Sequence, residues 1–177
     1  MTTRTWREVI DDAAEVNAQV NLFDVRLVSA AGEAPTTEYV GRPMGVLTEV
    51  ETDSALEEAD VLTIRARYAI SAHELKNEGK VGPSPEDPVA WRIEAVFAAS
   101  FHRTPEGPDL TPTQLASFAR TTAFMAIHPY AREFAQSLSG RFGYPPFTLE
   151  LIRVPRPGDP GLDSELVDLG ELAESST

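Results

Sequence analysis

Two long stretches of alternating apolar and polar residues constrain the fold of this 177-residue chain most strongly. In segment 61–73 every second residue from Leu62 to Ala72 is hydrophobic, and in segment 89–103 the alternation runs from Trp91 to Phe101. Such a period of two buries one face of a β-strand and leaves the other toward solvent. The intervening segment is charged and rich in glycine and proline, which favours a hairpin connection. We therefore predict two long antiparallel strands that share one buried face.

Two further strands are predicted closer to the N-terminus, at residues 20–29 and 46–52. In the first, Phe23, Val25 and Leu27 alternate with charged residues, which indicates one buried face. The second repeats the alternation with valine and threonine on one side. The sheet is thus expected to lie within residues 20–103.

Helical periodicity flanks the sheet region on both sides. Residues 5–18 carry apolar side chains on one face and acids on the other, which is typical of an amphipathic helix. Residues 111–142 begin with Thr111 as N-cap, Pro112 at the first helical position and Gln114 where a capping box needs it. A second, longer helix is therefore predicted there.

One proline interrupts the long helix, and further prolines end it. Pro129 lacks a backbone donor and clashes with the preceding turn, so we expect a kink or a restart near His128. The pair Pro145-Pro146 excludes helix beyond that point. Residues 144–154 are then expected to be extended.

The order of these elements predicts an α+β fold: an N-terminal helix, a four-stranded antiparallel sheet and a long kinked helix packed on it. We assign residues 1–155 to one domain. Residues 156–177 form an acidic tail in which Leu162, Leu166 and Leu169 have the spacing of a weak amphipathic helix. Because one helix covers a wide apolar sheet incompletely, we expect oligomerisation to bury the surplus.

Composition narrows the choice of partners. The net charge of −13 repels nucleic-acid phosphates and attracts basic segments. The chain has no cysteine, which excludes disulfides and thiolate chemistry and fits a reducing cytoplasm. Apolar runs are too short to insert into a membrane, and acidic residues occupy the N-terminal region where a signal peptide would be apolar. We expect a cytoplasmic protein.

No arrangement of residues indicates catalysis or a cofactor. The histidines, His73, His102 and His128, lie far apart without metal-ligand spacing. The sequence has no phosphate-binding loop, dinucleotide fingerprint or nucleophile elbow. We therefore predict a protein that is not an enzyme and holds no metal.

The run His128-Pro129-Tyr130-Ala131-Arg132-Glu133, followed by Gly143, Pro145-Pro146 and Phe147-Thr148-Leu149, resembles the signature of the SecB export chaperones. The match is closer still to the SecB-like chaperones of actinobacterial toxin–antitoxin–chaperone systems. It covers about a quarter of the chain and keeps the spacing from the tyrosine to the prolines. The resemblance implies an ATP-independent holdase that binds unfolded or nascent polypeptides, for export or for one dedicated client such as an antitoxin.

The candidate client-binding residues are apolar side chains in loops or extended segments, on backbone that can adapt to varied peptides. They are Tyr39, Val40, Met44, Tyr144, Phe147 and Leu149. In the family the first long connection helps to line the client groove, which favours the same role for residues 30–45. The alternative is that these side chains close the edges of the core.

The resemblance also implies an oligomer and, less directly, a motor partner. SecB is a dimer of dimers with its long helix between the pairs, and small side chains at Ala116, Ala119, Ala123 and Ala126 suit close helix contact. SecB contacts the SecA motor through acids on its outer sheet face. Asp24 matches one of them, but Val28 stands where the family has another acid, which favours a dedicated client over general export.

Two other functions fit the predicted fold. One is a small-molecule or lipid carrier whose internal cavity is lined by four aromatic side chains, Tyr68, Trp91, Phe97 and Phe101. The other is a structural interaction protein without a client.

Overall fold

The computed structural model describes residues 4–35, 41, 43–57, 60–75, 82–105 and 107–152. The elements, in chain order, are α1 (Trp6–Asn17), β1 (Val20–Glu33), β2 (Met44–Glu57), β3 (Val61–Glu74), β4 (Val89–Arg103), α2 (Pro112–Phe118), a π-helical segment η1 (Ala119–Ala123) and α3 (Phe124–Arg141). This order confirms the predicted α+β arrangement. The predicted tail helix lies outside the described residues.

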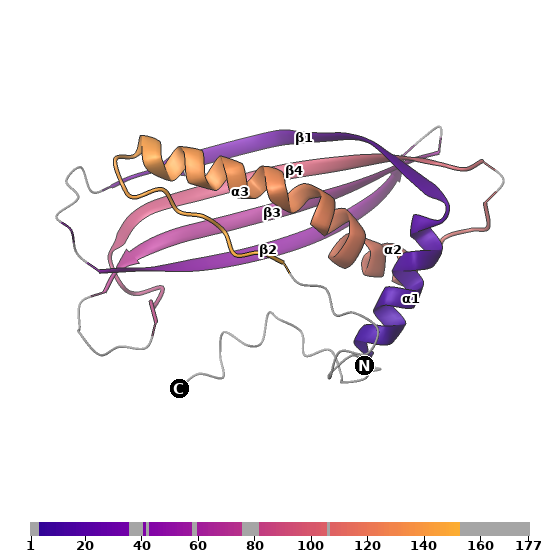
Figure 1. Cartoon of the computed structure of the whole chain (residues 1–177), viewed down its shortest axis with the longest axis horizontal. Coiled ribbons are helices and arrows are strands. Elements are labelled where there is room, and N and C mark those ends of the chain that lie inside the picture. The colour runs from indigo at the N-terminus through magenta and orange to yellow at the C-terminus, as the bar shows by residue number, and fades with distance from the viewer. Residues whose placement is uncertain are drawn as a thin grey trace.

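The four strands form one antiparallel sheet with the spatial order β1-β4-β3-β2, so β1 and β2 are its edges (Figure 1). β3 and β4 pair over almost their full length, for example Leu62 with Phe101 and Ile70 with Ile93. The hairpin predicted from the two alternating runs is thereby confirmed. The helical layer, formed by α2, η1 and α3, lies on one face of the sheet, which we call the inner face.

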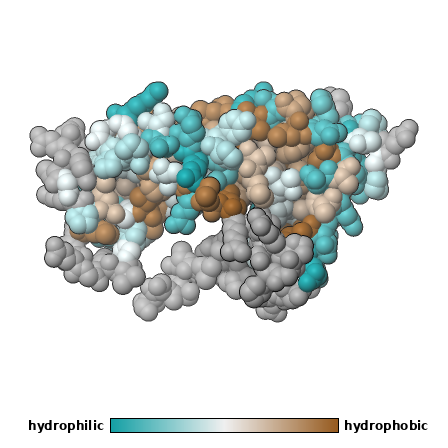
Figure 2. All heavy atoms as spheres, viewed as in Figure 1, coloured by the Kyte–Doolittle hydropathy of each residue, from teal (hydrophilic) through white to brown (hydrophobic). Residues whose placement is uncertain are grey.

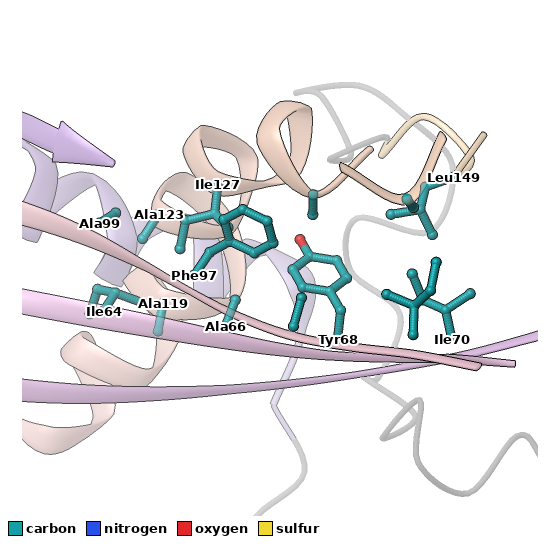
Figure 3. Close-up of a cluster of buried hydrophobic side chains, with 14 of the residues drawn as sticks. Ile64, Ala66, Tyr68, Ile70, Phe97, Ala99, Ala119, Ala123, Ile127 and Leu149 are labelled. Carbon is teal, nitrogen blue, oxygen red and sulfur yellow. The ribbon is translucent and has the colours of Figure 1, made fainter. Parts of the chain in front are cut away.

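The core lies between the two central strands and α3. All the alternating residues of β3 from Leu62 to Ala72 are buried, as are those of β4 from Trp91 to Phe101. Figure 3 shows Tyr68 and Phe97 between the strands and the helical layer, with Ala123 and Ile127 of the helices next to Phe97. Each large apolar side chain buried in this way contributes about 1.5–3 kcal/mol relative to its exposed state.

Alanines set how closely the helical layer approaches the sheet. Ala119, Ala123, Ala131 and Ala135 recur on the side of the helix that faces the strands, and each is buried. Small side chains here let the aromatic rings of the sheet reach the helix backbone.

The helix remains α-helical at Pro129, where a kink was expected. α3 continues through Pro129 from Phe124 to Arg141, and the irregular turn is η1, upstream of it. Proline leaves one carbonyl of the preceding turn without its usual partner, but this solvent-facing position tolerates the loss. The prediction of a restart near His128 is wrong.

Strand β1 is longer than predicted and less regular. Its pairing with β4 shifts register between Leu22 and Asp24 and again between Leu27 and Ser29, so Phe23 and Val28 occupy bulges. A bulge inserts one residue and reverses the face on which the next side chain lies. Phe23 therefore stacks on His102 of the outer face, with ring centroids 4.0 Å apart, and the prediction that it is buried is wrong.

Strand β2 is also longer than the predicted 46–52 and begins at Met44. Met44 thus belongs to the start of a strand, paired with Glu74, rather than to a loop. Tyr39 and Val40 lie outside the described residues.

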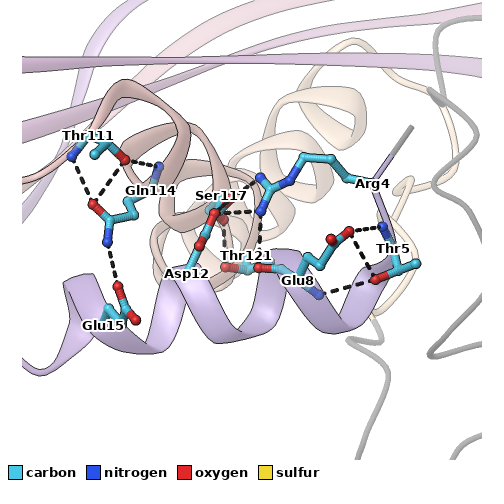
Figure 4. Close-up of polar contacts among 9 residues, drawn as sticks. All are labelled: Arg4, Thr5, Glu8, Asp12, Glu15, Thr111, Gln114, Ser117 and Thr121. Carbon is cyan, nitrogen blue, oxygen red and sulfur yellow. Dashed lines mark hydrogen bonds and ion pairs between the residues drawn. The ribbon is translucent and has the colours of Figure 1, made fainter. Parts of the chain in front are cut away.

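A polar network joins α1 to α2 at one end of the sheet (Figure 4). Thr5 and Thr111 each form a capping box, with Glu8 and Gln114 respectively. Arg4 pairs with Asp12 and donates to Ser117 of α2, and Gln114 donates to Glu15 of α1. The two capping boxes and this network fix α1 against the start of the long helix.

Candidate functional site

The helical layer leaves both edges of the inner sheet face uncovered. A helix with its side chains is about 10–12 Å wide, and neighbouring strands are about 4.8 Å apart. A single helix therefore covers about two strands at any one level, and the long helix crosses the sheet obliquely, from β2 and β3 at α2 and η1 to β4 and β1 at the end of α3 (Figure 1). Part of the inner face of the two edge strands, β1 and β2, is therefore exposed to solvent.

We call the uncovered inner face of β2 the β2 margin. Its residues are those whose partners on β3 point into the core: Val46 opposite Ala72, Thr48 opposite Ile70, Val50 opposite Tyr68, Thr52 opposite Ala66 and Ser54 opposite Ile64. Thr48, Val50 and Ser54 are exposed, although their partners on β3 are buried. An extended peptide laid here would cover apolar and hydroxyl side chains next to an unpaired strand edge.

The uncovered inner face of β1, the β1 margin, is more apolar. Leu22 and Leu27 lie opposite the buried Phe101 and Phe97, yet both remain exposed. Figure 2 shows hydrophobic atoms at the surface on this side of the molecule. The prediction that Leu27 is buried is wrong because β1 is an edge strand, and the end of α3, which reaches β1 at Gly32, leaves Leu27 exposed.

Residues 144–152, which we call the C-terminal segment, run back from the end of α3 along its β2 side (Figure 1). The hydroxyl of Tyr144 donates to the carbonyl of Ala90 at 3.2 Å, and the Phe147 N–H donates to Ser139 Oγ at 2.8 Å. Leu149 is 3% exposed, whereas Leu151 is 81% exposed. The C-terminal segment is thus anchored in the core by Leu149 and carries one exposed leucine, Leu151. We call this segment the wall of the β2 margin.

His128 ties this wall to the helix and the sheet. Its Nε2 lies 2.7 Å from the carbonyl oxygen of Glu150, and its Nδ1 lies 3.3 Å from the hydroxyl of Tyr68. Burial raises the pKa of Tyr68 well above its ordinary value, so the hydroxyl keeps its proton. The sequence predicts only a capping or hinge role for His128 and gives no sign of these partners.

The candidate client-binding residues differ in how far a partner could reach them. Tyr144 and Leu149 are buried within the single chain, and Phe147 and Met44 are half-buried. Tyr144 and Leu149 therefore close the edge of the core, as the alternative interpretation of the sequence expects. Client contact remains a prediction, and it is best supported for Met44 and Phe147.

Four exposed apolar residues of the fold were not among the candidate client-binding residues. They are Val50 of the β2 margin, Leu151 of the C-terminal segment, and Met125 and Tyr130 of α3. Val50 was predicted only as a strand residue, because a period of two cannot show that its strand lies at an edge. Leu151 lies two residues after the matched motif, in the segment expected to line the client groove, but it was not among the candidate client-binding residues.

The four alanines proposed for an oligomer contact fall on two sides of the helix. Ala119 and Ala123 face their own sheet and are 2% and 0% exposed, so they pack within the chain. Ala116 is exposed and Ala126 is half-buried. Of the four alanines, only Ala116 and Ala126 are accessible to another subunit. Their part in an oligomer contact remains a prediction.

The outer sheet face carries no helix and mixes both signs of charge. Asp24, the candidate motor contact, lies 3.7 Å from the guanidinium of Arg26, and Val28 is exposed in its bulge. Arg65 and Arg67 of β3 are exposed on the same face. Among the described residues, this face therefore carries both basic and acidic side chains.

The aromatic residues proposed for a carrier cavity are instead packed against other rings. Phe101 contacts Phe118, Tyr68 contacts Phe124, Phe97 contacts Phe134 and Trp91 contacts Phe147, with centroid distances of 5.0–6.1 Å. Each of the four rings of the sheet is therefore matched by a ring from the helices or the C-terminal segment. This packing argues against a ligand cavity lined by these four side chains.

Among the described residues, no group of three or more histidine and acidic side chains is placed to hold a metal ion. None of the described helices has the length and apolar character required to span a bilayer.

Comparison with known proteins places this fold in a family. No family model matches the sequence. The chain is 30% identical over 177 residues to the SecB-like chaperone Rv1957 of Mycobacterium tuberculosis strain H37Rv, covering 91% of this chain and 94% of that protein. It is 29% identical over 171 residues to the SecB-like chaperone MT2006 of strain CDC 1551, with the same coverage.

A solved structure agrees with the sequence relatives. The Rv1957 chaperone in complex with a ChAD peptide from the Rv1956 HigA1 antitoxin superposes with a TM-score of 0.68 at 22% identity, covering 82% of this chain and 99% of that one. At this identity the superposition establishes the fold. Chaperones of this kind are not enzymes, so the prediction of a non-enzymatic role is confirmed by the relatives. On the extent and identity of the sequence match, this chain belongs to the family of SecB-like chaperones.

Proposed function

We propose that the chain is an ATP-independent holdase that binds extended, apolar polypeptide along the β2 margin and the C-terminal segment. The observation that carries this proposal is the uncovered inner face of β2 beside the exposed Leu151. Apolar surface left open next to a strand edge is stabilised when another chain covers it. No bond is made or broken, and the client is held by burial.

We infer that the client is dedicated rather than general, and that an antitoxin is the class that fits best. The Rv1957 chaperone, a relative over most of both chains, has been solved with an antitoxin peptide. The pairing of Asp24 with Arg26 and the exposed Val28 weaken the case for a SecA contact. Negative surface charge adds a preference for segments that carry lysine and arginine.

We further propose that the protein works in the cytoplasm as a homotetramer, a dimer of dimers. The margins of β1 and β2 and the exposed Met125 and Tyr130 leave more apolar surface than one chain can bury. Self-association would cover part of it and leave the client-binding part open.

Suppression of aggregation tests the holdase against the carrier. Stoichiometric amounts of the protein should suppress aggregation of an unfolded model client without ATP. Changing Met44 and Tyr39 to glutamate should abolish suppression and leave the oligomer size unchanged in native mass spectrometry. Full suppression by that double variant would show that the groove is misplaced, and a co-purifying lipid without suppression would favour the carrier.

A further inference from the structure

His128 connects three parts of the chain that lie far apart in sequence. Its ring sits on α3, with Nδ1 3.3 Å from the Tyr68 hydroxyl on β3 and Nε2 2.7 Å from the Glu150 carbonyl in the C-terminal segment. The side chain is 9% exposed. Both ring nitrogens are therefore engaged in a largely dry environment.

These partners determine which form of the ring the arrangement requires. A carbonyl oxygen only accepts, so Nε2 must carry the proton that is donated to Glu150. In the neutral ring Nδ1 is then an acceptor, and it takes the hydrogen of the Tyr68 hydroxyl. Only the neutral imidazole with hydrogen on Nε2 satisfies both neighbours.

Few other contacts hold the second half of the C-terminal segment. Phe147 is bonded to Ser139, but within the described part of the chain residues 148–152 make one hydrogen bond to the rest of the fold, the one from His128. The buried side chain of Leu149 is their other anchor. Thr148 and Ile152 are only half-buried, so among the described residues the hydrogen bond from His128 and the side chain of Leu149 are the main contacts that hold the wall.

We propose that His128, oriented by Tyr68, is a positioning residue that fixes the C-terminal segment and thereby sets the wall of the client-binding margin. We call the two hydrogen bonds of His128 the clasp. The clasp is a property of the free chain, and only its consequence, client binding, rests on the proposed function.

The absence of native cysteine allows a direct test with single introduced thiols. Leu149→Cys reports release of the segment, Leu151→Cys reports an exposed position on the same segment, and Ala135→Cys on α3 reports global unfolding. The ratio of labelling rates at 149 and 151 corrects for the intrinsic reactivity of the thiol. Each reporter is combined with His128→Phe, His128→Gln and Tyr68→Phe.

The expected result is selective for the segment. His128→Phe, which keeps a ring and removes the bond, should raise the 149-to-151 ratio about tenfold, the loss of one hydrogen bond, and leave labelling at 135 unchanged. His128→Gln, which can both donate and accept a hydrogen bond, should keep the low ratio.

Client binding is then measured separately with a fluorescent, lysine-flanked apolar peptide. His128→Phe should weaken its affinity at least several-fold. A ratio unaffected by His128→Phe, or equal acceleration at position 135, would overturn the clasp. Release of the segment with unchanged peptide affinity would overturn its role as the wall. If the wild-type chain binds no peptide, the proposed function fails, and the labelling ratios still decide the clasp.

Discussion

Individual side chains show where sequence reasoning succeeds and where it stops. The alternation in β3 and β4 correctly assigns Leu62 to Ala72 and Trp91 to Phe101 to the core, because the period of two is a direct consequence of strand geometry, but it misses the buried Ala90 and Ala98. Phe23 fails, since hydrophobicity does not reveal the bulge that turns it to the outer face. His128 shows a third case: Tyr68 is 60 residues away and Glu150 is 22 residues away, so no local pattern could identify them.

Two alanines of the long helix provide a matched test of which side faces the core. Ala123 is fully buried and Ala116 is exposed. Ala123→Leu should lower the free energy of unfolding by about 1–3 kcal/mol, because the added atoms must enter a packed core. Ala116→Leu should change it by less than about 0.5 kcal/mol. Urea denaturation followed by circular dichroism measures both, and equal effects would contradict the assigned helix orientation.

At the scale of elements, the ends of helices and strands were predicted unevenly. The capping box at Thr111 is visible in sequence because its parts lie three residues apart, and the structure confirms it. The π-helical turn η1 was not predicted, and neither was the absence of a break at Pro129. Helix geometry there depends on packing against the sheet, which the residues of the helix alone do not contain.

The two capping boxes lead to a prediction for α1 and α2. Thr5→Ala and Thr111→Ala should each reduce the free energy of unfolding by about 1 kcal/mol, since each leaves an amide at a helix start without its acceptor. Thr113→Ala, at an exposed position just beyond the second cap, is the control and should have little effect. If Thr113→Ala proved as destabilising as the cap variants, the capping hydrogen bonds would not be the cause.

For the whole molecule, the width of the sheet relative to one helix explains why apolar surface remains open. The sequence predicted this surplus, since it contains two long apolar strand faces and one long helix. It could not assign the surplus to the margins of β1 and β2, because the spatial order of the strands is a property of the fold.

Oligomerisation is predicted to use the exposed side of α3. Tyr130→Glu should convert the proposed homotetramer to smaller species, because a carboxylate would be buried in the contact. Arg67→Glu, on the outer face of the sheet, should leave the assembly intact. Native mass spectrometry gives both masses. Tetramers in both variants, or in neither, would show that the contact lies elsewhere.

The charge of the whole chain should tune which clients bind. With a net charge of −13, affinity for a lysine-flanked apolar peptide should fall several-fold between low and physiological salt, as screening shortens the reach of the field. A peptide with the same apolar residues and neutral flanks should show little change in fluorescence anisotropy titrations. Equal salt dependence of the two peptides would remove the electrostatic preference.

The most direct test compares two exposed valines on opposite faces of the sheet. Val50 belongs to the β2 margin and is 36% exposed, whereas Val28 lies in a bulge on β1 and is 52% exposed. Aggregation of an unfolded client is followed by light scattering in the presence of each lysine variant at equal concentration. The account predicts that Val50→Lys loses suppression while Val28→Lys retains it; retained suppression by Val50→Lys would contradict the claim that the β2 margin holds the client.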